Sequence, residues 1–123
     1  MTIAKLKLAV AVGTSILFVA SVNAQSVDMK RHAPPTVRGI AIDNCSTLNT
    51  RHDCTGVGQQ RAADGACKHL GHKRASNYLI GPAAGRKPKA YHLSVGEASD
   101  GTETTREWIL LPTGATFAWV DCE

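Results

Sequence analysis

The chain has 123 residues, with 14 Lys or Arg, 10 Asp or Glu and a formal net charge of +4. Two of the basic residues, Lys5 and Lys7, precede an apolar run and are expected to be removed with it, which leaves a nearly neutral chain. This balance, without aromatic residues interleaved among basic ones, argues against a nucleic-acid partner and against a membrane-surface helix. The retained length of about 100 residues allows one small domain.

Residues 1–24 have the organisation of a secretory signal peptide. An apolar run from Leu8 to Ala20 follows the basic residues, and small residues precede an expected cleavage after Ala24. An uncleaved anchor is the alternative, but the run is shorter than the ~20 residues that a spanning helix needs. We therefore expect a periplasmic or secreted protein with no membrane span after cleavage.

Residues 25–35 predict a flexible N-terminal arm, because charged residues and the Pro34-Pro35 pair leave little apolar surface to bury. Residues 36–123 predict a single domain. Its first strand is expected over residues 36–43, where Val37, Ile40 and Ile42 are β-branched.

Residues 54–75 predict one short helix that carries a cysteine. Thr55 is the expected N-cap, and Gly71 stands where a left-handed residue ends a helix. The predicted buried face has the three-and-four spacing of a helix and consists of Ala63, Ala66, Cys67 and Leu70.

The remaining sequence predicts strands over residues 74–80, 90–95, 104–111 and 115–122. In the last strand, Ala118, Val120 and Cys122 alternate with larger residues and are expected to accept the helix. The predicted fold class is α+β, with one short helix packed on a small antiparallel sheet of four or five strands and with two disulfides.

All four cysteines lie after the predicted signal peptide, and an even number in a small exported chain predicts two disulfides. Four cysteines allow three connectivities. The helix places Cys67 about 13 Å along its axis from a start near Gly58, out of easy reach of Cys54. This geometry favours Cys67 with Cys122 across the core, and Cys45 with Cys54 around a small loop.

Histidines and cysteines crowd into residues 52–72 and raise the possibility of a zinc or copper site. The spacing matches no paired metal-binding unit, and disulfide formation removes the thiolates, so we predict no metal site. If a metal is bound, the ligands are expected to be His52, His69 and His72, with His92 or His32 as additional donors.

The chain lacks the sequence motifs of nucleophile elbows, zinc proteases and phosphate-binding loops. Glu103 and Glu107 are a pair of acids of the kind that acid–base catalysis uses, but both lie on a predicted exposed edge. We therefore expect no enzyme activity and no cofactor.

Aromatic residues are the third candidate for a functional role, as a binding surface, although we expect them in the core first. If one tryptophan is exposed beside the basic loop, a contact patch for a protein or glycan results. The residues of this predicted surface are Trp108, Trp119, Tyr91, Arg86, Lys87 and Lys89.

The segment Ala63-x-x-x-Cys67-Lys68-x-Leu70-Gly71-x-x-x-Ala75 resembles the helix signature of scavenger receptor cysteine-rich domains. In that family the helix cysteine pairs with one near the C-terminus, so the resemblance also implies Cys67 with Cys122. The segment is similar, too, to small exported bacterial domains of unknown function that end in a Trp-containing strand and a cysteine. The receptor domains have more cysteines and a Trp-Gly motif, so their ligand-binding acids and calcium sites are not carried over.

These observations together predict a small, exported, non-enzymatic binding domain whose partner is a protein or a cell-envelope component. Periplasmic metal binding through histidines is the alternative, and a small hydrolase or an inhibitor of one is the third possibility.

Overall fold

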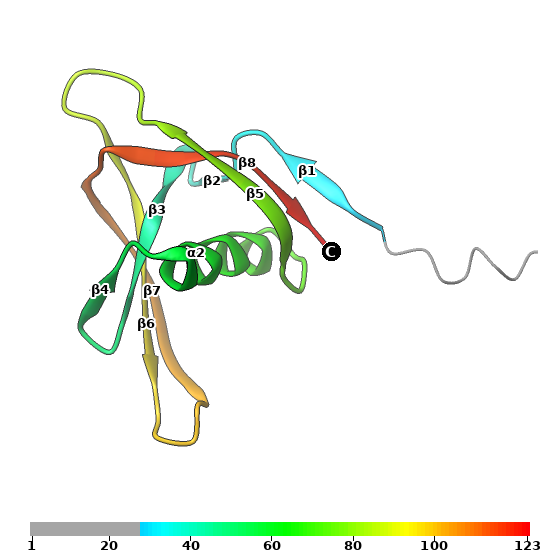
Figure 1. Ribbon diagram of the computed structural model, residues 1–123, viewed down its shortest axis with the longest axis vertical. Coiled ribbons are helices and arrows are strands. Elements are labelled where there is room, and N and C mark those ends of the chain that lie inside the picture. The colour runs from blue at the N-terminus through cyan, green and yellow to red at the C-terminus, as the bar shows by residue number, and fades with distance from the viewer. Residues whose placement is uncertain (1–27) are drawn as a thin grey trace, which may run out of the picture.

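The computed structural model describes residues 28–123, which form eight strands and one helix (Figure 1). The elements in chain order are β1 (Lys30–His32), β2 (Thr36–Val37), β3 (Ile40–Leu48), β4 (Arg51–Asp53), α2 (Gly56–His69), β5 (Ala75–Pro82), β6 (Lys89–Glu97), β7 (Glu103–Pro112) and β8 (Ala115–Cys122).

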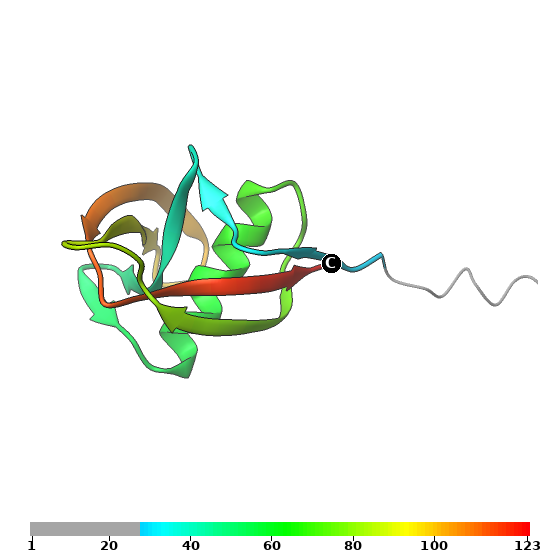
Figure 2. The same ribbon diagram turned by 90° about the horizontal axis from the view of Figure 1, so that it is seen from above.

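The strands belong to one mixed sheet with the central order β1-β8-β3-β6-β7. β2 and β4 pair with β3, while β5 pairs with β8. All pairs are antiparallel except β3 with β6. β3 meets β8 at the single pair Asp43–Thr116, so the sheet divides into two arms that bend around the helix (Figures 1 and 2).

The helix α2 lies in the angle between the two arms of the sheet (Figure 1). It begins after Thr55, as predicted. At its C-terminal end, the backbone N–H groups of Leu70 and Gly71 donate to carbonyls of the last turn, and the φ of Gly71 is +92°. Its buried residues are all small: Gly58, Ala62, Ala63, Gly65, Ala66 and Cys67. Small side chains allow the backbone of α2 to approach β3, β5 and β8 closely.

The core lies between this small-residue face and the sheet. Phe117, Ile42, Val37 and Val120 are fully buried there, and Tyr78 contacts Phe117 edge to face with ring centroids 5.4 Å apart. These few large side chains supply most of the buried apolar area, because the small residues of the helix supply little of it.

Two disulfides are present, as predicted, and they join Cys45 to Cys54 and Cys67 to Cys122. The first connects β3 to the residue that follows β4. The second fastens α2 to β8 through two completely buried residues. Two disulfides in so small a domain fit folding in an oxidising compartment.

The predicted fold class was wrong. The structure is mostly β, with eight strands in a mixed sheet, rather than a helix on a small antiparallel sheet. β3 continues to Leu48, five residues past the end of the first strand that was predicted over residues 36–43. It then pairs in parallel with β6, because the chain crosses over through β4, α2 and β5 before it returns.

The last strand also differs from the prediction. Phe117, which was expected on the face away from the helix, is buried with Val120 and Cys122, whereas Ala118 is exposed. The register against β5 shifts between Leu79 and Ile80, and this irregularity rotates the side chains before Ala118 onto the opposite face.

The predicted signal peptide, residues 1–24, lies outside the described residues. The predicted arm over residues 25–35 reaches into them, where Lys30–His32 form β1 against β8. Arg31 fixes this strand because its guanidinium donates two hydrogen bonds to Asp121, at 2.7 and 3.0 Å, and stacks 3.7 Å above Trp119. Within residues 28–123, no helix is long and apolar enough to cross a membrane.

The two disulfides are expected to contribute unequally to stability. Cys67–Cys122 closes a loop of 55 residues and Cys45–Cys54 one of 9. Chain entropy then predicts that replacing both cysteines of a pair by Ala costs about 4 kcal/mol for the long loop and about 2.5 kcal/mol for the short one. Urea unfolding of the two double variants measures the difference, and equal losses would contradict the entropic account.

Close packing predicts that Gly58→Ala destabilises the protein. A Cβ at Gly58 collides with the backbone carbonyl of Asp53, which has no flexible end that can move away. Gly56→Ala is the matched control, since nothing lies within 4 Å of the added carbon and helix propensity favours Ala by up to ~1 kcal/mol. In thermal unfolding, Gly58→Ala should lower the Tm while Gly56→Ala leaves it equal or higher.

Candidate functional site

The three histidines that were predicted as alternative metal ligands lie in three different places. His52 stacks on His92 with ring centroids 5.2 Å apart, and His69 meets Trp108 edge-on at 5.8 Å. His72 instead faces His32. The sulfur atoms nearest to His52 and His72 belong to disulfides and are not thiolates. The structure therefore does not bring the predicted set together.

The predicted aromatic surface is also divided. Trp108 is half-buried beside the helix, whereas Trp119 lies under the Arg31 guanidinium. Tyr91 accepts a hydrogen bond of 3.3 Å from Arg38, whose guanidinium carbon lies 4.8 Å from the ring centre. The basic residues of the predicted surface are exposed, on the loop after β5 and at the start of β6; they are Arg86, Lys87 and Lys89. The three aromatic residues of the predicted surface thus contact three different residues.

A buried polar network, which the sequence analysis missed, connects three parts of the sheet. His92 Nδ1 lies 2.7 Å from Asp43 Oδ2, and His92 Nε2 lies 2.7 Å from the Thr47 hydroxyl. Thr113, in the β7–β8 turn, donates to Asp43 Oδ1 at 2.8 Å. The order of acid, imidazole and hydroxyl is that of a catalytic relay. His92 is only 2% exposed, however, and lies under His52, so the network joins strands instead of opening to a substrate.

Electrostatics agree with a structural role for this network. Burial opposes ionisation of Asp43, but hydrogen bonds from His92, then from Thr113 and the Cys45 N–H, outweigh it and hold the pKa of this carboxyl below its ordinary value. The ionised form is therefore the one that the fold stabilises.

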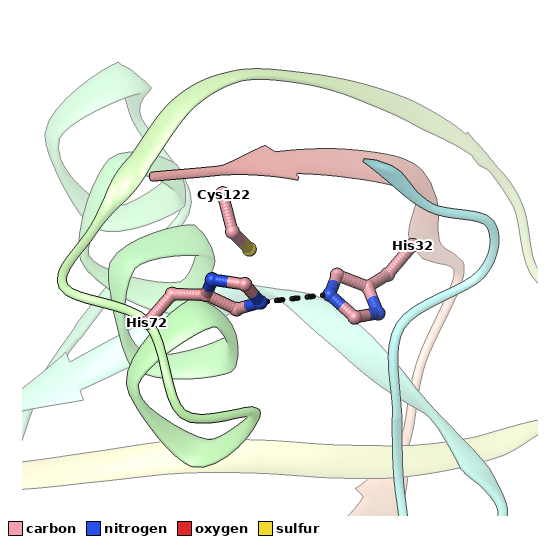
Figure 3. A group of neighbouring side chains, drawn as sticks. All are labelled: His32, His72 and Cys122. Carbon is pink, nitrogen blue, oxygen red and sulfur yellow. Dashed lines mark hydrogen bonds between the residues drawn. The ribbon is translucent and has the colours of Figure 1, made fainter. Parts of the chain in front are cut away.

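A second histidine pair lies where β1 approaches the loop after α2 (Figure 3). His32 Nε2 and His72 Nε2 are 3.2 Å apart, and the rings are inclined by 65°. Both residues are half-buried. Burial, followed by the nearby His72 and Lys30, lowers the pKa of His32. Cys122 Sγ lies close to both rings, but it is bonded to Cys67.

β7 presents an open edge of the sheet. It is ten residues long, pairs only with β6, and stands at the end of the strand order. The β6–β7 hairpin extends past the helix, at the bottom of Figure 1. Three consecutive apolar residues are exposed on β7: Ile109 by 37%, Leu110 by 42% and Leu111 by 37%.

The opposite edge of the sheet, β5, is protected in a way that β7 is not. Asp64 of the helix accepts a hydrogen bond of 2.9 Å from the Ala75 N–H, and Gln60 donates one of 3.1 Å to the Ala75 carbonyl. The Asn77 side chain accepts from the Tyr78 N–H. Within residues 28–123, no side chain bonds in this way to the backbone of β7. The outward N–H and C=O groups of β7 are available to another strand.

Comparison of the chain with family models, with curated proteins and with solved structures finds no match. The helix resemblance to scavenger receptor cysteine-rich domains therefore gives no family assignment.

The network around Asp43 predicts a specific acid sensitivity. Because the pKa of Asp43 is lower in the folded protein, its contribution to stability is complete above the unfolded value near 4 and is lost as pH falls through the folded value. Asp43→Asn should cost about 1–3 kcal/mol at pH 7 and show a weaker further loss in acid than wild type. Urea unfolding at pH 7 and at pH 3 measures both.

Other carboxyl groups also have a lowered pKa, among them Asp53 and Asp121, and they contribute equally to the acid sensitivity of wild type and variant. The difference in acid sensitivity between the two proteins therefore reports on Asp43 alone. Glu107→Gln, at an exposed position on β7, is the control and should leave stability almost unchanged at both pH values. An acid dependence of Asp43→Asn that equals that of wild type would contradict the role given to this carboxylate.

Proposed function

We propose that this protein is a secreted or periplasmic, non-enzymatic binding module that captures an extended segment of a protein partner along β7. The observation that carries the proposal is the open ten-residue edge of β7 with its exposed apolar end. An incoming strand gains backbone hydrogen bonds from such an edge, and neighbouring side chains supply selectivity. The two disulfides support export, because they form and persist in oxidising compartments.

The side chains on the two faces of β7 determine which residues a binding partner needs. Trp108 pairs with Leu93 and lies against the helix, so its face is the inner one. Glu107, Ile109 and Leu111 alternate with it and point to the outer face. A complementary strand in antiparallel orientation therefore has two apolar residues opposite Leu111 and Ile109, followed by a basic residue opposite Glu107.

A second copy of this chain fits the edge less well. Two antiparallel β7 strands in full-length register place Arg106 opposite Ile109 and Glu103 opposite Pro112. Matching the apolar ends instead, with Leu110 opposite its own counterpart, limits the overlap to residues 108–112 and includes a proline without an N–H. A partner of different sequence avoids both mismatches.

A designed peptide tests the proposal. The capped hexapeptide Thr-Val-Thr-Val-Thr-Lys is expected to bind, and to shift the outward-pointing backbone amides of β7 in nitrogen–proton correlation spectra. Replacing both Ile109 and Leu111 by Lys should weaken binding about tenfold, since losing contact with two partly exposed side chains costs about 1–2 kcal/mol.

Two controls accompany this titration. Leu79→Lys changes an apolar residue on β5 that is even more exposed, at 51%, and should leave the affinity unchanged. A peptide that ends in Glu instead of Lys should bind more weakly because of Glu107. Shifts centred on β5 or β4, or sedimentation that shows β7-dependent dimers in place of peptide binding, would overturn the proposal.

A further inference from the structure

We propose that His32 and His72 bind a divalent cation of the zinc class, at the junction between β1 and the loop that follows α2 (Figure 3). This site uses a residue of the predicted N-terminal arm, and it is separate from the β7 edge. Figure 3 shows the two imidazole rings pointing toward each other from different elements.

The separation of the two nitrogens matches the distance between two ligands of one metal ion. Zinc–imidazole bonds of about 2.0–2.1 Å, at a tetrahedral angle, place the two nitrogens about 3.3 Å apart. The Nε2 atoms of His32 and His72 are 3.2 Å apart. An ion bound to both Nε2 atoms takes the place of the contact between the rings and requires that their lone pairs turn toward a common point.

Both backbones that carry the pair are already fixed. β1 pairs with β8 so that His32 lies opposite Val120, and the Arg31–Asp121 ion pair holds the strand beside it. The His72 N–H donates to the Cys67 carbonyl at 2.8 Å, at the end of the helix. Little conformational entropy is therefore lost when the rings bind an ion.

The chemistry of the donors selects the class of ion. Imidazole nitrogens suit zinc, copper and nickel, whereas calcium and magnesium require oxygen ligands. Cys122 Sγ lies beside the pair but remains in its disulfide, so the protein supplies two nitrogen ligands and no thiolate.

Space for further ligands lies next to His72. An open cavity of about 590 Å³ is lined by Asp28, Gly71, His72, Lys73, Arg74 and Glu123. Water can complete the coordination from this side, and the carboxylates of Asp28 and Glu123 offset the positive charge of Lys73 and Arg74. Two protein ligands with open positions predict a reversible site, weaker than a structural zinc site with four.

Titration of the purified protein with zinc chloride tests the inference. Calorimetry is expected to show one ion per chain. Long-range nitrogen–proton spectra of the imidazoles should show shifts of the His32 and His72 ring nitrogens, while those of His52, His69 and His92 stay in place. This measurement uses wild-type protein, so it does not depend on the folding of any variant.

His32→Gln and His72→Gln should each weaken zinc binding about tenfold or more, since each removes one of two ligands. His69→Gln is the matched control, because it removes a histidine from the same part of the chain and should leave the affinity unchanged. Binding to His32→Gln as tight as to wild type, shifts at His52 or His69 in place of the pair, or no binding of millimolar zinc would each overturn the inference.

Discussion

The Cys67–Cys122 bond compensates for the weakness of the helix that it fastens. The buried face of α2 consists of Gly, Ala and Cys, which allows close approach to the sheet but buries little apolar area. A covalent link through two fully buried sulfurs supplies the attachment that larger side chains provide in other helices. Its other end is β8, which pairs with both β1 and β5. The position of the helix therefore determines where one whole arm of the sheet lies.

Local patterns in the sequence predicted those elements that local interactions stabilise. The helix limits around Thr55 and Gly71 and the long strands after residue 74 followed from caps, periodicity and turn residues. β1 and β4 have three residues each and no pattern of their own, because they form only by pairing with strands distant in sequence. The parallel pairing of β3 with β6 likewise depends on tertiary contacts, and without it the sheet was taken to be small and antiparallel.

The candidate sites likewise depend on contacts between residues that are distant in sequence. Histidines close in sequence, such as His69 and His72, were considered together because they crowd into one segment, yet in the structure they contact different residues. The contacts that form join His32 to His72 and Asp43 to His92, separated by 40 and 49 positions. One signal was present: Asp43 follows the apolar residues 40–42, and His92 stands between Tyr91 and Leu93, where a polar side chain that becomes buried needs a partner. Sequence alone identifies the need for a partner but not which residue it is.

The proposal that β7 binds a strand rests on how the two edges of the sheet differ. An open edge invites uncontrolled pairing, and β5 avoids it by using helix side chains that occupy the backbone groups of Ala75. Within residues 28–123, no helix side chain hydrogen-bonds to the backbone of β7, and the β6–β7 hairpin extends past the helix (Figure 1). The charges of Glu103, Arg106 and Glu107 protect one half of β7, while the half from Ile109 to Leu111 stays apolar. An edge that is protected along only half its length discourages pairing between two copies of the chain. It still accepts a strand whose charges complement its own. A strand that binds selectively requires both properties.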